Sequence, residues 1–101
     1  MPANHLLDGL PGEQLIRDGL ADAQAGRCTV AACLVAMGRP RFERAGLLGE
    51  HAPLQPDPEL QLYRLLRREG GDAYSRYNAL LRELVSLEQA LDHRTTANAR
   101  R

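Results

Sequence analysis

The segment Val30–Met37, VAACLVAM, limits the possible folds more than any other part of the chain, because it has no charged side chain and its most polar group is a thiol. Thr29, a residue type favoured at helix N-caps, precedes the segment, and Gly38 follows it. A helix that is apolar on every side is normally buried on every side. The segment therefore predicts a central helix around which the rest of a small domain packs.

Leu and Ala dominate the apolar residues and β-branched residues are few, which favours helices over strands. The chain has 101 residues, of which 44% are hydrophobic and 26% are charged. These values are typical of one globular domain. The predicted fold class is all-α, a small bundle of roughly four to five helices with a Pro-rich connector and a long amphipathic C-terminal helix.

Glycine, proline and the apolar periodicity divide the chain into segments. We expect a flexible arm at 1–11, a single helical domain at 12–93 and a disordered tail at 94–101. The domain is expected to consist of N-terminal helices, a connector and a helical hairpin, at 12–48, 49–57 and 58–93. The helices themselves are expected at about 12–25, 29–37, 40–45, 58–69 and 73–93.

Three single residues refine this prediction. Gly19 lies in the apolar face of the first expected helix, where glycine costs roughly 1 kcal/mol of helix propensity. Close approach by a neighbouring helix would compensate for that cost. Asp57 and Asp72 precede the last two helices and are expected to be their N-caps.

The segment 73–93 has the clearest pattern in the chain. One apolar row follows the alternating four-and-three spacing of a coiled-coil seam: Ala73, Tyr77, Leu80, Leu84, Leu87 and Leu91. A second row lies beside it: Tyr74, Leu81 and Val85. The two rows together are wider than one neighbouring helix would cover. The candidate interface residues are Tyr74, Tyr77, Leu81, Leu84, Val85, Leu87 and Leu91. For the two tyrosines, packing in the domain core is the favoured alternative.

Two groups of arginines form the alternative candidate site, for nucleic acid: Arg39, Arg41 and Arg44, and then Arg64, Arg67 and Arg68. The first group follows the apolar helix in the outline of a helix-turn-helix. The second expected helix of that outline is short, however, and it carries Arg44 where the motif usually buries an aliphatic residue. The second group forms a basic face that is also typical of a solvated helix.

The histidines and acidic residues do not form a known catalytic or metal-binding motif. His5, His51 and His93 lack the spacing of zinc ligands. Asp18 and Asp22 lie four residues apart on one helix, and without a second acidic motif we interpret them as surface carboxylates. We expect no enzymatic activity, no cofactor and no metal.

Cys28 and Cys33 lie on either side of a helix start and are expected to point in different directions, which disfavours a disulfide. Cys33 is expected to behave as a small hydrophobic residue. The lack of a disulfide framework, and the lack of a signal peptide or membrane span, predict a cytoplasmic protein. The use of Arg without Lys predicts a bacterial source.

The formal net charge of zero predicts no long-range attraction for nucleic acid or an anionic membrane. The function expected from the sequence is a non-catalytic helical protein–protein interaction module, whose partner is a second copy in a homodimer or another helical protein. A small nucleic-acid-associated regulator is the alternative.

Overall fold

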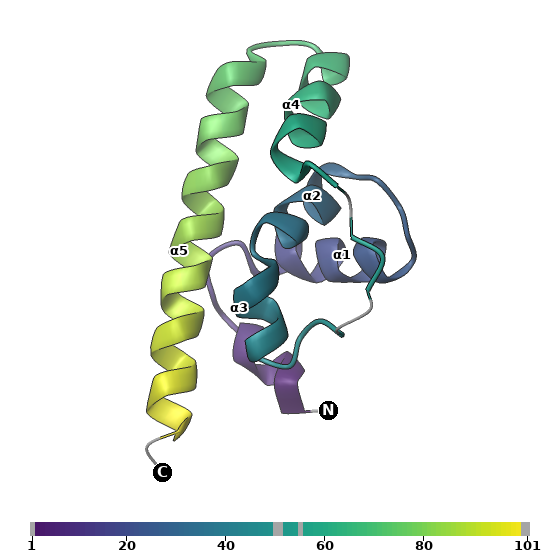
Figure 1. The fold of residues 1–101 in the computed structure, drawn as a ribbon. Helices are drawn as coiled ribbons and strands as arrows, with labels where there is room; N and C mark the ends of the chain where they lie inside the picture. Colours follow the sequence, from purple (N-terminus) through teal and green to yellow (C-terminus); the bar gives the residue numbers. More distant parts are fainter. Residues whose placement is uncertain (1, 50–51, 55, 100–101) are drawn as a thin grey trace.

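A computed structural model describes residues 2–49, 52–54 and 56–99, and it is helical over most of that length (Figure 1). In chain order the elements are the 3-10 helix η1 (Pro2–Leu7) and the α-helices α1 (Glu13–Gln24), α2 (Val30–Met37), α3 (Arg39–Arg44), α4 (Pro58–Glu69) and α5 (Ala73–Ala99). The described residues contain no strand, and the predicted all-α class is confirmed. Within the same residues, no helix combines the length and the hydropathy that crossing a membrane requires.

Helix α2 is the centre of the fold, as its uniformly apolar sequence predicts. Its residues from Ala31 to Val35 are all buried, and the helix packs against α1, α3, α4 and α5. Thr29 is its N-cap, and the Thr29 hydroxyl accepts a hydrogen bond from the Ala32 amide at 3.1 Å. A capping side chain of this kind satisfies one of the amides that the first turn leaves without a helical partner.

Helices α1 and α2 come into close contact at Gly19. A Cβ atom at this position would overlap the carbonyl oxygen of Ala31 and would lie 2.7 Å from a methyl carbon of Val35. The absence of a side chain therefore allows the two backbones to touch, which is the compensation expected for a glycine inside a helix.

The structure differs from the prediction at both ends of the chain. Residues expected to form a flexible arm include η1, which packs against α5, and both Leu7 and Leu10 are buried. Helix α5 continues past His93 to Ala99, through most of the expected tail. Arg94 links the two ends, because its guanidinium donates hydrogen bonds to the carbonyl oxygens of Leu6 at 3.0 Å and Asp8 at 2.7 Å.

The two aspartates expected to cap helices behave differently. Asp72 caps α5, accepting hydrogen bonds from the amide of Ser75 at 3.0 Å and from its hydroxyl at 2.8 Å. These bonds lower the pKa of the Asp72 carboxyl. Asp57 precedes α4 but makes no capping hydrogen bond with its side chain, and its backbone is left-handed, with φ of 47°. The start of α4 at Pro58 therefore rests on the fixed φ of proline rather than on a side-chain cap.

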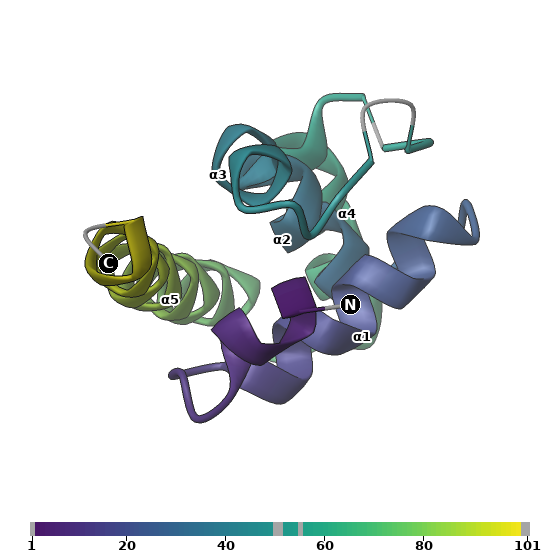
Figure 2. The ribbon, with the colours of Figure 1, turned by 90° about the horizontal axis from the view of Figure 1, so that it is seen from below.

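Helix α5 lies along one side of the molecule, with α1 to α4 on the other (Figures 1 and 2). Its 27 residues correspond to about 40 Å of helix, close to the longest dimension of the chain, 46 Å. A single hydrophobic cluster includes side chains from η1 and from every α-helix. The N-terminal helices and the α4–α5 hairpin thus share one core, while much of the outer face of α5 is left uncovered.

Replacing Gly19 with alanine tests the close approach of α1 and α2. Helix propensity alone would make this variant more stable by roughly 1 kcal/mol. Because the new methyl group has no space against Ala31 and Val35, we expect a net destabilisation of about 1–3 kcal/mol, typical of an overpacked core. Urea unfolding followed by circular dichroism would measure it. A variant more stable than the wild type would contradict this account of the helix contact.

Candidate interaction surface on helix α5

The inner row of α5 belongs to the core of the chain itself. Leu84, Leu87 and Leu91 are buried, with exposed fractions of 5%, 0% and 1%. These three leucines were predicted as interface residues from their coiled-coil spacing, but their neighbours are other helices of the same chain. They are therefore not available to a partner of the folded protein, and the predicted interface is reduced to the outer part of the helix.

Tyr77 also lies within the helical hairpin. Its ring packs edge-on against that of Tyr63 of α4, with ring centroids 5.9 Å apart and an angle of 75° between the planes. Close by in the sequence, Arg76 and Glu69 form an ion pair of 2.7 Å between the same two helices. Edge-to-face aromatic pairs add about 0.5–1.5 kcal/mol to the free energy of burial. Of the two alternatives for this tyrosine, the geometry matches packing within the domain.

The outer row of α5 is the candidate interaction surface. We define the outer strip as Tyr74, Asn78, Leu81 and Val85, which are spaced by four, three and four residues. Tyr74 is 68% exposed and Val85 is 48% exposed, both high values for large apolar side chains. Leu81 is half-buried and lies between them. Residues at this spacing share one helix face, so the strip is a continuous line rather than scattered exposed residues.

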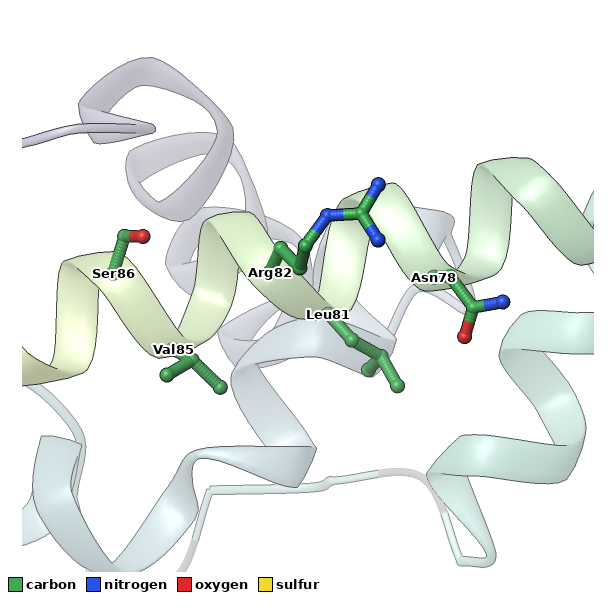
Figure 3. A pocket seen from close by; sticks show the side chains of 5 residues that line it. All are labelled: Asn78, Leu81, Arg82, Val85 and Ser86. Carbon is green, nitrogen blue, oxygen red and sulfur yellow. The ribbon is translucent and has the colours of Figure 1, made fainter.

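A shallow hollow of about 380 Å³ follows the strip. The residues that line it are Asn78, Leu81, Arg82, Val85 and Ser86. In Figure 3 the side chains of Leu81 and Val85 point to the same side of α5, whereas those of Arg82 and Ser86 rise on the other. The lining thus has an apolar centre and a polar edge, and Arg82 is its one charged side chain. This arrangement is suited to an apolar helix face or side chain of a partner.

An ion-pair cluster lies at the C-terminal end of the strip. Glu88 and Asp92 continue the same spacing, but both interact with Arg41 of α3, at 3.5 Å and 2.7 Å respectively. Asp92 first, and Glu88 second, raise the pKa of the Arg41 guanidinium. The Glu88 side chain is only 12% exposed. A Cβ at Gly38 would lie 2.9 Å from Glu88, so this glycine leaves room for the carboxylate.

These contacts bear on the first group of candidate nucleic-acid-binding residues, Arg39, Arg41 and Arg44. Arg41 is held by α5, and Arg39 forms an ion pair of 2.8 Å with Glu43. Arg44 is exposed, and α3 itself has only six residues. The three arginines predicted as one basic group therefore do not form a shared free face, and α3 offers little surface to a DNA groove.

The second group of arginines does share a face. Arg64, Arg67 and Arg68 are exposed on α4, on the side opposite the buried Leu62 and Leu66. No carboxylate of the described residues forms an ion pair with any of the three. Leu60, which is 48% exposed, lies on the same outer side. Glu69, the acidic residue next along the chain, is occupied by Arg76.

The described residues contain no group of three or more His, Cys, Asp or Glu side chains arranged to hold a metal ion. His5 lies 3.3 Å from Asp8, His93 is exposed, and His51 falls outside the described residues. Asp18 accepts a hydrogen bond from Gln14 at 2.8 Å. Asp22 has a structural role, since hydrogen bonds from Thr29 and then Arg27 lower its pKa.

The two cysteines differ in exposure. Cys28 is exposed and Cys33 is buried, and both are free thiols. Cys28 is near enough to Cys33 to contribute to the raised pKa of its thiol. The difference in direction expected from helical spacing stays a prediction. Cys28 precedes the helix and the cap residue Thr29 has an extended backbone, so the spacing of a regular helix does not determine where Cys28 lies.

Comparison with known proteins found no protein family, curated protein or solved structure that matches this chain.

The contact of Arg41 with α5 can be tested by substitution. Arg41→Ala would leave Glu88 without its cation in a largely buried position, and a carboxylate in that position is destabilising without a partner. We expect a clear decrease in Tm for Arg41→Ala at neutral pH. Arg44→Ala, which removes an exposed arginine from the same helix, is the matched control and should leave Tm nearly unchanged. Equal effects of the two substitutions would show that the ion-pair cluster does not stabilise the fold.

Proposed function

We propose that this protein is a non-catalytic helical interaction module that acts through the outer strip of α5, and that its first partner is a second copy of the chain. The observation that carries the proposal is the line formed by Tyr74, Leu81 and Val85 beside an apolar hollow. Single exposed apolar residues are common on protein surfaces, but an aligned set with an adjoining hollow is typical of an interaction site.

The chemistry of the strip favours a second copy. Most homo-oligomers have a two-fold axis, so that the same patch lies on both sides of the interface. Such a patch must not repel itself, and the strip meets this condition because its members are uncharged and the hollow beside it contains one charged side chain, Arg82. In an antiparallel pairing with the axis between Leu81 and Val85, each Leu81 would face Val85 of the second copy.

The size of the strip predicts a weak dimer. From Tyr74 to Val85 the helix rises about 17 Å, and with a helix width of about 10–12 Å the footprint is roughly 200 Å². A typical stable interface buries about 800 Å² on each partner. We therefore expect association that depends on protein concentration rather than a permanent dimer.

The test is light scattering after size-exclusion chromatography, carried out over a wide range of protein concentrations under reducing conditions. The wild type should shift from monomer to dimer as its concentration rises. The double variant Tyr74→Glu, Val85→Glu should remain a monomer, because it places like charges in the apolar centre of the interface. Both side chains are exposed, so the variant should keep its helical circular dichroism spectrum.

Ala79→Glu is the matched control, since it adds a negative charge at an exposed position of α5 outside the strip. It should associate as the wild type does. A wild type that remains monomeric at all concentrations would exclude a second copy as the partner. Dimerisation that survives the double variant would exclude the outer strip as the interface.

The second candidate function is nucleic-acid binding through the outer face of α4. One observation favours it over the α3 arginines: Arg64, Arg67 and Arg68 lie together and have no carboxylate partner among the described residues. Like charges three and four residues apart on a helix destabilise it by a few tenths of a kcal/mol, and a bound phosphate backbone would remove that repulsion. The forked geometry of arginine is suited to phosphate oxygens.

This alternative predicts weak, salt-sensitive binding of single-stranded DNA or RNA. If the three arginines each neutralise one phosphate, the logarithm of affinity should fall with the logarithm of salt concentration with a slope of about −2. Fluorescence anisotropy with a labelled oligonucleotide would measure it. Replacing the three arginines with Gln should abolish binding, whereas Arg44→Gln with Arg82→Gln, also exposed arginines, should leave most of it. No binding by the wild type at low salt would exclude this function.

A further inference from the structure

Cys28 and Cys33 occupy a defined pair of positions at the start of α2. Thr29 is the N-cap, so Cys28 is the residue before the cap and Cys33 is the fourth residue of the helix. Side chains at these two positions commonly pack against each other across the first turn, an arrangement known as the hydrophobic staple. In this chain a cysteine occupies each of the two positions, and neither has a role in the proposed interaction strip.

The environments of the two thiols differ. Cys28 is exposed to solvent, whereas Cys33 is 0% exposed and belongs to the hydrophobic core. Burial, together with the neighbouring Cys28, raises the pKa of Cys33 to about 11. Of the two, Cys28 is therefore the thiol that reaches a reagent in solution, and Cys33 stays protonated beside it.

The surrounding hydrogen bonds hold the pair in this arrangement. The Cys33 amide donates to the Thr29 carbonyl oxygen at 3.0 Å. The Thr29 hydroxyl donates to one carboxylate oxygen of Asp22 and Arg27 donates to the other, each at 2.9 Å. The residues on either side of Cys28 are thus both attached to α1 through a single aspartate. This network fixes the residues on both sides of Cys28, so that Cys28 does not lie on a free loop.

We propose that Cys28 and Cys33 are a redox-active pair that forms a reversible disulfide at the start of α2. In the first step the Cys28 thiolate attacks hydrogen peroxide, the O–O bond breaks, and Cys28 becomes a sulfenic acid with release of hydroxide. In the second step the Cys33 sulfur attacks the sulfur of Cys28, the S–O bond breaks, and the proton of Cys33 leaves with the oxygen as water. The sum is two thiols and one hydrogen peroxide giving one disulfide and two waters.

The test is oxidation of the fully reduced protein with hydrogen peroxide, followed by intact mass spectrometry and by maleimide labelling after denaturation. We expect the mass to fall by two hydrogens and both maleimide-reactive thiols to disappear together. Dithiothreitol should restore both. After tryptic digestion the mass loss should lie in the peptide 28–41, which contains both cysteines and extends past Arg39 because the Arg39–Pro40 bond resists trypsin. Non-reducing electrophoresis should show a single chain.

Two variants separate the roles of the thiols. Cys33→Ala should stop at the sulfenic acid of Cys28, which dimedone traps and which does not accumulate in the wild type. In Cys28→Ser the buried Cys33 should remain unmodified in the folded protein, as a circular dichroism spectrum would verify. The proposal is overturned if wild-type Cys28 proceeds to a sulfinic acid or to a disulfide between two chains while Cys33 remains labelled by maleimide.

The result of the oxidation experiment does not depend on whether the proposed interaction function is correct. The cysteine pair lies at the start of α2, and neither thiol belongs to the outer strip of α5. Association of the reduced protein tests the strip, and the mass of the oxidised monomer tests the cysteine pair, so that failure of one leaves the other measurable.

Discussion

The burial of α2 on all sides is the physical condition on which the remaining structure depends. A short helix of apolar side chains gains free energy only when several neighbours cover it, at about 25 cal/mol for each Å² of apolar surface removed from water. Here α1, α3, α4 and α5 provide that cover. The contact with α1 is close because Gly19 has no side chain, and the side chains of α4 and α5 complete the same core.

Helix α5 has two different faces, of which only one helps to cover α2. Its inner row completes the core, while its outer row faces solvent and includes a shallow hollow. Polar contacts fix its position at both ends: Asp72 and Arg76 at its start, and Arg41 and Arg94 near its end. A helix held in this way presents its outer strip in one orientation. That is an advantage for recognition, because little conformational entropy is lost on binding.

The arrangement of charges explains how a neutral chain can carry a local basic face. Several arginines are paired with carboxylates within the domain, including Arg27, Arg41 and Arg76. Arg64, Arg67 and Arg68 are exposed on α4 and lack such pairs among the described residues. Any attraction for a polyanion would therefore act only at short range, since the net charge of zero produces little long-range field.

Local patterns in the sequence determined the helices, because helix propensity, capping and apolar periodicity act over a few residues. The uniformly apolar α2, the Thr29 cap and the two apolar rows of α5 could all be predicted in this way. Only the tertiary structure decided which row of α5 is covered, because periodicity shows which residues share a face but not which face meets a neighbour. The partners of two arginines also could not be predicted from the sequence. Asp92, the partner of Arg41, is distant in the sequence, and Arg94 binds backbone carbonyl oxygens, which every residue has. The position of Cys28 relative to Cys33 likewise depends on the extended cap residue Thr29, where helical spacing no longer applies.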